Sequence, residues 1–209
     1  KMNINDKIHF SPNYKMVQLD FSNRKEIIKA FNDRILNYYL KPLKYLINKK
    51  ENDSAFSSGI LCFALVDAFA RYTSDDNVVK RRIINWLKIN ITSISKINNN
   101  QNKPEYTPET VSEKIYISFR NGLIHESHIK KGGQFSFYEP NTVNYNDEYL
   151  IINPRHFYKD LKKYFEKLII DLNKCDSKYN IFIKRIREDF EDECEEFKEL
   201  MKRKGKIIN

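Results

Sequence analysis

The segment AFSSGILCFALVDAFARYT, at residues 55–73, is the feature that most constrains what this chain can fold into. It is apolar on nearly every helical face, and Asp67 interrupts it. Helices of this kind are buried on all sides, because apolar surface is more stable away from water. The segment therefore predicts a central helix surrounded by other helices. Its uninterrupted apolar run, GILCFALV, is far shorter than the roughly 20 residues that span a bilayer, so we expect no membrane partner.

Helical periodicity and capping signals predict further helices on both sides of this segment. Asn23 and Glu26 form a capping pair ahead of one amphipathic helix, which Pro42 is expected to kink or split. Thr107 and Pro108 have the N-cap and first-turn pattern of another helix. The predicted helices lie near residues 23–50, 54–73, 75–91, 107–124, 154–174 and 180–204.

The sequence pattern changes between residues 132 and 153. QFSFYEP and EYLIIN are alternating or β-branched, are separated by a polar turn, and predict a β-hairpin. The fold class is therefore all-α, a helical bundle with a β-hairpin inserted after the fourth helix. We expect an N-terminal arm or short strand over 1–21, a helical domain over 22–177, and a charged C-terminal helix over 178–209 packed on the same domain.

Charge and cysteine content limit the partners of the chain. The 209 residues carry a formal net charge of +9, which favours RNA through phosphate contacts; the alternative is a compositional bias, because Lys, Asn and Ile are frequent throughout. Cys62, Cys175 and Cys194 form no CxxC pair, so neither a metal site nor a disulfide framework is predicted. No secretory signal peptide opens the sequence, and we expect a cytoplasmic protein with no cofactor.

One motif carries chemistry. The stretch SFRNGLIHE places Arg120 five residues before His125, near the end of an amphipathic helix. Arginine binds phosphate through a planar fork, and histidine exchanges protons near neutral pH. Together they can cleave RNA without a metal ion. In a regular helix the two side chains point about 140° apart, so either the helix loosens near Gly122, which also permits close approach of a partner backbone, or a second copy completes the site.

The heptad RNGLIHE at 120–126 resembles the signature of the HEPN superfamily, in which an arginine, a polar residue and a histidine lie near the end of a core helix. The resemblance covers residues 20–175, and only the heptad is specific. It implies a HEPN-like homodimer with the two motifs facing each other. It further implies metal-independent endoribonuclease activity that leaves a cyclic phosphate, as in toxins and anti-phage defence proteins. The catalytic residues carried over are Arg120, Asn121 and His125.

The resemblance also implies an antitoxin or defence-system partner. Toxins silenced by a nucleotidyltransferase antitoxin have a tyrosine two residues after the histidine. Here that residue is Ser127, so AMPylation at this position is not predicted. The alternative functions are a non-catalytic HEPN-like module that binds RNA or a nucleotide or mediates dimerisation, and a helical adaptor without a nucleic-acid role.

Four residues beside the motif are candidates for RNA binding. The lysines would hold phosphates, the tyrosine would stack on a base, and the histidine would assist on RNA. The alternatives are a core or interface aromatic and a loop histidine. These candidates are Lys130, Lys131, Tyr116 and His128.

Two carboxylates are candidates for positioning the catalytic groups. Asp67 lies on the apolar helix and needs a partner there; it either holds Arg120 or pairs with Arg71 one turn later. Glu126 either tunes His125 or is solvated. The alternative to a catalytic arginine is a surface arginine paired with Glu113 or Glu126, and the alternative to a catalytic histidine is a histidine near a helix C-terminus, favoured there by the helix dipole.

Overall fold

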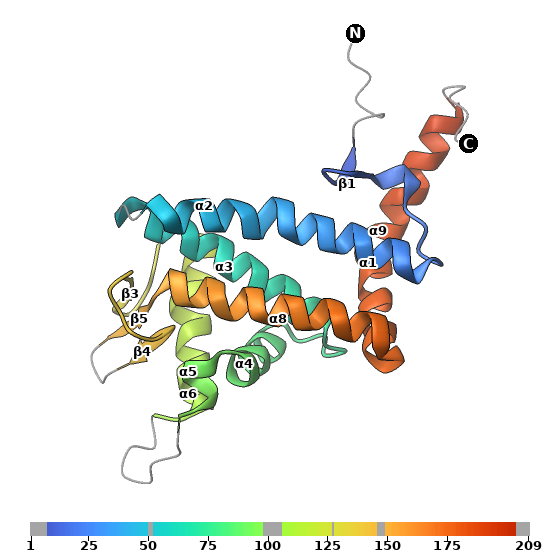
Figure 1. The fold of residues 1–209 in the computed structure, drawn as a ribbon. Coiled ribbons are helices and arrows are strands. Elements are labelled where there is room, and N and C mark those ends of the chain that lie inside the picture. Colours follow the sequence, from blue (N-terminus) through green and yellow to red (C-terminus); the bar gives the residue numbers. More distant parts are fainter. Residues whose placement is uncertain (1–7, 50–51, 98–105, 127, 146–148, 204–209) are drawn as a thin grey trace. The chain divides into compact units, whose positions relative to one another are not determined.

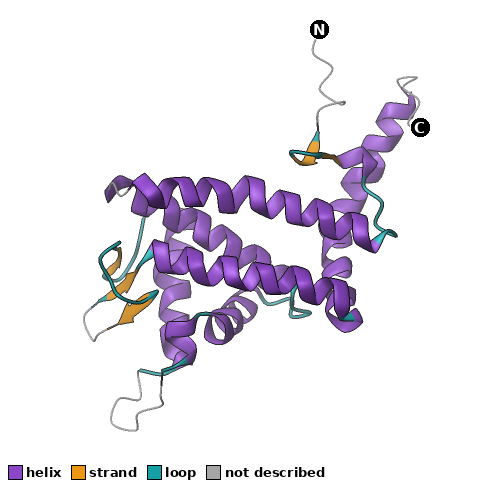
Figure 2. Ribbon diagram, viewed as in Figure 1, coloured by secondary structure: helices purple, strands orange, loops and turns teal. Residues whose placement is uncertain are grey.

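The computed structural model describes residues 8–49, 52–97, 106–126, 128–145 and 149–203. Within these residues the chain is mostly helical, with two small sheets, as predicted for its fold class (Figure 2). The α-helices are α1 (Arg24–Ile35), α2 (Lys41–Lys49), α3 (Asn52–Tyr72), α4 (Val79–Asn90), α5 (Thr92–Ser95), α6 (Pro108–Ile115), α7 (Gly122–Glu126), α8 (Pro154–Lys174) and α9 (Asp176–Arg203) (Figure 1). Three shorter helical elements are the 3₁₀-helix η2 (Met16–Gln18) and the π-helical turns η3 (Leu36–Leu40) and η4 (Tyr116–Asn121). The strands are β1 (His9–Ser11), β2 (Tyr14–Lys15), β3 (Gly133–Phe135), β4 (Val143–Tyr145) and β5 (Leu150–Ile152).

The chain divides into two compact units. Unit 1 comprises Lys1–Lys41 with Lys167–Asn209, and unit 2 comprises Pro42–Glu166. Both divisions fall inside runs of helix, because packing rather than helix ends defines a unit. They differ from the boundaries at 21/22 and 177/178 expected from the sequence, and that three-part division stays a prediction.

Unit 1 joins the N-terminal strands to the C-terminal helix. Phe10 of β1 is fully buried and meets Phe190 of α9 edge to face, with ring centroids 5.1 Å apart. The Asp33 carboxylate on α1 accepts hydrogen bonds from Ser11 Oγ at 2.7 Å and from Asn13 Nδ2 at 2.8 Å. These contacts fix the short strand that the sequence analysis allowed for in the N-terminal arm.

The start of α1 and the region of Pro42 both follow from local sequence. The N-cap prediction is confirmed, because the Asn23 side chain accepts from the backbone N–H of Glu26 at 3.2 Å. The chain stays helical through Pro42, and the expected break takes the form of the π-helical turn η3 directly before α2. Proline has no N–H for the carbonyl of Tyr38, four residues earlier, and a wider turn accommodates this loss.

Helix α3 forms the core of unit 2. Cys62, Phe63, Val66 and Phe69 are completely buried. Phe63 stacks on Phe119 of η4 and meets Phe157 of α8 edge to face, with centroid distances of 5.8 Å and 5.5 Å. The prediction of a central helix is therefore confirmed. Among the described residues it is also the one helix long and apolar enough to span a membrane by length and composition, but 56% of that stretch is buried, as in a core helix.

Burial of α3 is less complete than its composition predicts. One stripe along the helix is only half-buried, whereas the opposite face is fully enclosed. The members of this stripe are Ile60, Leu61, Ala64, Asp67 and Ala68.

The small sheet of unit 2 differs from the predicted hairpin. Its strand order is β3-β5-β4, with β5 antiparallel to β4 and parallel to β3. The antiparallel partner of LII (Leu150–Ile152) is thus VNY (Val143–Tyr145), in the segment expected to be a polar turn. Phe135 of β3 lies against Phe119, at 5.1 Å between ring centroids, and over Gly59 of α3, where a Cβ atom would be 2.0 Å from the ring. Side-chain alternation does not distinguish parallel from antiparallel neighbours, and this packing on the helical core selects the parallel one.

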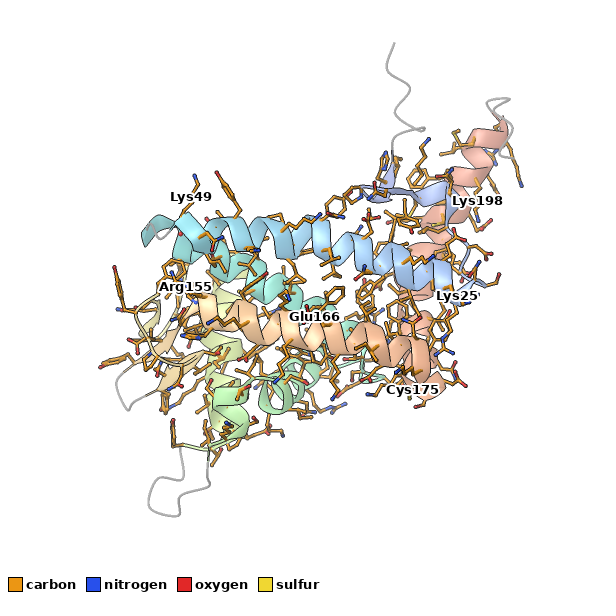
Figure 3. All side chains as sticks on the ribbon, in the orientation of Figure 1. Lys25, Lys49, Arg155, Glu166, Cys175 and Lys198 are labelled. Carbon is orange, nitrogen blue, oxygen red and sulfur yellow. The ribbon has the colours of Figure 1, made fainter. Side chains whose placement is uncertain are left out.

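The start of α8 follows the sheet. Asn153 caps the helix, as predicted, because its Oδ1 accepts from the backbone N–H of Arg155 at 2.9 Å. Its Nδ2 donates to the carbonyl of Glu139 at 2.6 Å, which ties the preceding loop to the helix. Arg155 is labelled at this end of α8 in Figure 3.

The Asn23 cap gives a stability prediction. We expect Asn23→Ala to lower the free energy of unfolding by about 1 kcal/mol, because it removes the acceptor for the Glu26 N–H. Asn23→Asp keeps an acceptor and is expected to stay close to the wild type. Urea unfolding followed by circular dichroism measures both. An alanine variant as stable as the aspartate variant would contradict the assigned cap.

Candidate functional site

The helix that carries the motif changes geometry at the motif itself. α6 begins with the predicted cap, in which Thr107 Oγ1 accepts from the backbone N–H of Thr110 at 3.1 Å. It then passes into η4, and α7 resumes at Gly122. The helix therefore does loosen directly before Gly122, and the 140° of a regular helix does not describe residues 120 to 125. Single π-helical turns inside α-helices are frequent at functional sites.

Arg120 is held by neighbours on two helices. Its Nε donates to Asp67 Oδ2 of α3 at 3.1 Å, and its Nη1 donates to Asn121 Oδ1 at 3.3 Å. The guanidinium carbon lies 5.7 Å from the centroid of the Tyr116 ring. Only 15% of the arginine side chain is exposed. Of the two partners weighed for Asp67, the structure shows Arg120.

The contact between Asp67 and Arg120 follows from the packing of α3 against η4. Phe63 and Phe119 stack nearly parallel, with 17° between their planes. Asp67 is one turn after Phe63, and Arg120 directly follows Phe119, so the aromatic stack brings the carboxylate beside the guanidinium. Within the described part of the chain, Asp67 Oδ1 is buried and accepts no hydrogen bond. The arginine is thus the neutralising partner of this carboxylate, and its removal would leave a charge in a poor environment.

The structure describes the side chains of Arg120 and Asn121 but not that of His125. Asn121 contacts Arg120, which favours orientation of the arginine among the roles considered for it. The backbone of His125 belongs to α7. Its side chain lies outside the described residues, so the convergence of histidine and arginine on one phosphate stays a prediction.

The loop after α7 folds back along the motif helix. The backbone N–H of His128 donates to the Gly122 carbonyl at 3.2 Å, and that of Lys130 donates to the Ser118 carbonyl, within η4, at 2.9 Å. A Cβ atom on Gly122 would lie 2.3 Å from the His128 carbonyl oxygen. The glycine was expected to admit the backbone of a partner copy, and it is the chain's own loop that approaches here. A sequence pattern does not identify which backbone comes close.

The four RNA-binding candidates lie in three different settings. Tyr116 is nearly buried, at 9% exposure, and lies against Arg120, which matches the core alternative. His128 Nε2 is 3.7 Å from Glu126 Oε2, and Lys130 forms an ion pair with the same carboxylate. Lys131 lines a pocket. Glu126 is therefore engaged by this loop, and its influence on His125 stays a prediction.

Sequence reasoning missed the pocket beside the motif. Its volume is about 180 Å³, and it lies between the α6–η4 helix and the β4–β5 end of the sheet. The signal was present, since Lys114, Ile117 and Ser118 recur at helical spacing. The opposite wall comes from a segment expected to be a polar turn. The lining residues are Lys114, Ile117, Ser118, Lys131, Tyr145, Tyr149 and Leu150.

Gly122 gives a prediction about the loop. We expect Gly122→Ala to displace the loop, because the added methyl group overlaps the His128 carbonyl, even though alanine favours a helix by about 1 kcal/mol. Hydrogen exchange of the Lys130 amide should accelerate, while that of Phe157 of α8, which donates to the carbonyl of the preceding cap residue Asn153, should not. A more stable variant with unchanged exchange at Lys130 would disprove the close contact.

The chain was compared with family models, curated protein sequences and solved structures. No family model, curated protein sequence or solved structure matches the chain. Among the described residues, no three of the side chains of His, Cys, Asp and Glu gather closely enough to hold a metal ion.

Proposed function

We propose that this protein is a metal-independent endoribonuclease of HEPN type that works as a homodimer, in a cytoplasmic toxin or anti-phage defence system. The observation that supports this best is the fixed guanidinium of Arg120, held by Asp67 at 3.1 Å and by Asn121 at 3.3 Å. A cation that is already oriented stabilises charge developing on a phosphate without reorganising during the reaction. His125 follows in the next turn of the same helical segment.

The reaction divides between these side chains. His125 takes the proton of a ribose 2′-hydroxyl, or gives one to the departing 5′-oxygen. The 2′-oxygen attacks phosphorus and the bond from phosphorus to the 5′-oxygen breaks, which leaves a cyclic phosphate and a 5′-hydroxyl. Arg120 stabilises the negative charge of the phosphorane, and Asn121 orients Arg120.

Asp67 weakens the attraction of Arg120 for a phosphate but fixes the position of its guanidinium. A carboxylate beside the guanidinium reduces the net positive charge that a phosphate meets, but it fixes where that charge lies. Asp67 is accordingly a positioning residue that acts through Arg120. Its own side chain is 27% exposed, so the pair is partly screened by water.

The half-buried stripe on α3 supports the proposal that the protein is a homodimer. The stripe on α3 places Ile60, Ala64 and Ala68 around Asp67, each only partly covered. Apolar side chains left half-open beside a charged site suit an isologous contact, in which each protomer covers the other. Such a contact would bring the two arginine motifs close together.

A second candidate function is a non-catalytic module that binds RNA or a nucleotide or mediates dimerisation. The ion pair of Arg120 with Asp67 is also compatible with this function, because an arginine with a purely structural role is commonly neutralised by a carboxylate. The two functions differ in whether His125 transfers a proton.

The first test is cleavage of RNA in the presence of EDTA. We expect the wild type to cut, leaving cyclic phosphate ends, and His125→Ala to lose about 10²–10⁴-fold in rate, the contribution of a general acid–base group. His156→Ala is the matched control, since His156 lies on the first turn of α8, outside the motif heptad 120–126. If the His125 variant cleaves as fast as this control, the nuclease assignment is wrong and the non-catalytic module is favoured.

The second test concerns Asp67. We expect Asp67→Leu to lower kcat about ten-fold or more with little change in KM, because Arg120 loses its orientation but keeps its charge. Asp67→Asn still offers an acceptor to Arg120 Nε and should retain more activity. An unchanged kcat in the leucine variant, together with altered stability, would show that the ion pair is only structural.

A further inference from the structure

The pocket described above is formed by parts of unit 2 that are distant in sequence. One wall is the helical face of Lys114, Ile117 and Ser118. The facing wall is the end of the β4–β5 hairpin, where Tyr145 and Leu150 are directly paired across the antiparallel strands. Tyr145 is supported from behind by Tyr106, whose ring is stacked on it at 5.5 Å with 9° between the planes.

The charge of the pocket is positive. Lys114 bonds to the Tyr145 hydroxyl, and its Nζ lies 4.2 Å from the centroid of that ring. Lys131 stands at the rim and is exposed. Among the residues that the structure describes, the lining contains two lysines and no carboxylate. This composition attracts an anion, and phosphate is the commonest anion that lysines bind as point charges.

Lys131 is held in a strained backbone conformation. Its φ angle is 51°, in the left-handed region that non-glycine residues seldom adopt. The strain is maintained because the neighbouring Lys130 N–H is bonded to Ser118 and the Gly133 N–H is bonded to the Lys130 carbonyl. Strained residues of this kind cluster at binding and active sites. Here the strain places a lysine at the mouth of the pocket.

Size and wall chemistry narrow the ligand further. At about 180 Å³ the pocket is smaller than the roughly 300–1,000 Å³ of pockets that bury drug-sized ligands, so it suits a single ring system. Ile117 and Leu150 give it apolar walls, and Tyr149, 43% exposed, adds an aromatic ring at the opening. Bases stack on aromatic side chains with little dependence on sequence. A planar base that carries a phosphate fits both the walls and the charge.

The pocket is close to Arg120 along the chain. Ser118 lines it, and Arg120 is two residues further along η4. Ile117, which also lines the pocket, precedes Arg120 by three residues.

We propose that this pocket is a subsite for one nucleotide of an RNA strand whose neighbouring phosphodiester lies at Arg120. The proposal rests on the proposed function for the identity of the strand, but the binding itself is separable from cleavage. The base enters between Ile117, Leu150 and Tyr149, and its phosphate meets Lys131 and Lys114. The subsite holds the strand in register with the arginine.

Methyl NMR of the full chain tests the subsite. The probes are adenosine 5′-monophosphate and a 2′-O-methyl adenosine trinucleotide, which cannot be cleaved because its 2′-oxygen is blocked. Both should shift the methyl signals of Ile117 and Leu150 and leave that of Ile186, in α9 of unit 1, unchanged. Lys131→Gly should weaken binding of both probes about ten-fold, the loss of one charged hydrogen bond.

Matched variants distinguish specific binding by Lys131 from non-specific attraction to the net positive charge. Glycine is favoured at a positive φ, so Lys131→Gly removes the side chain without disturbing the loop. Lys131→Arg should retain binding, and Lys163→Ala, which removes a lysine of α8, should bind as the wild type does. Equal weakening in the glycine variant and in Lys163→Ala would indicate non-specific attraction and overturn the proposal.

The outcomes also separate the subsite from the nuclease. Shifts at Ile117 and Leu150 without any RNA cleavage would support the subsite while the proposed nuclease fails. Cleavage that is unaffected by Lys131→Gly, with no shift at these methyl groups, would overturn the subsite alone. Shifts with the mononucleotide but not with the trinucleotide would overturn its assignment to an RNA strand.

Discussion

The stacking of Phe63 on Phe119 is the contact on which the rest of unit 2 depends. It joins the core helix α3 to the motif helix within the buried interior. Phe135 lies against the same Phe119 ring, so the small sheet is anchored to the pair that fixes the two helices. Because Asp67 and Arg120 are each near one member of the stack, hydrophobic packing sets the geometry of the ion pair. Electrostatic attraction alone would not order two side chains that are partly open to water.

The π-helical turn η4 determines how the side chains of the motif are arranged around the helix. An α-helix offers side chains on fixed faces, and η4 alters that order at the residues that carry the motif. The wider turn is braced from outside, since the Ser118 carbonyl accepts the Lys130 N–H and Gly122 admits the His128 carbonyl. The loop that carries Lys131 is thus bonded to the helical segment that carries Arg120. The proposed catalytic arginine and the proposed nucleotide subsite share this support.

Positive charge is distributed unevenly around the motif. Lys130 is paired with Glu126 and Arg120 with Asp67, whereas the two pocket lysines face no carboxylate among the described lining residues. The net charge of +9 therefore says less about binding than the position of each lysine relative to its neighbours. This distinction separates Lys130 from Lys131, which are adjacent in the chain and equivalent by composition.

The sequence by itself determined the features that depend on neighbours within one or two helical turns. The caps at Asn23 and Thr107, the buried helix α3 and the mostly helical fold are of this kind, because capping and periodicity act locally. Tertiary structure decided what depends on residues distant in sequence. Asp67 has Arg71 one turn away, but the packing of α3 against η4 offers it Arg120 instead. The parallel pairing of β3 with β5, the approach of the loop to Gly122 and the pocket wall at Tyr145 likewise arise from contacts between remote segments, and no local pattern encodes which segments meet.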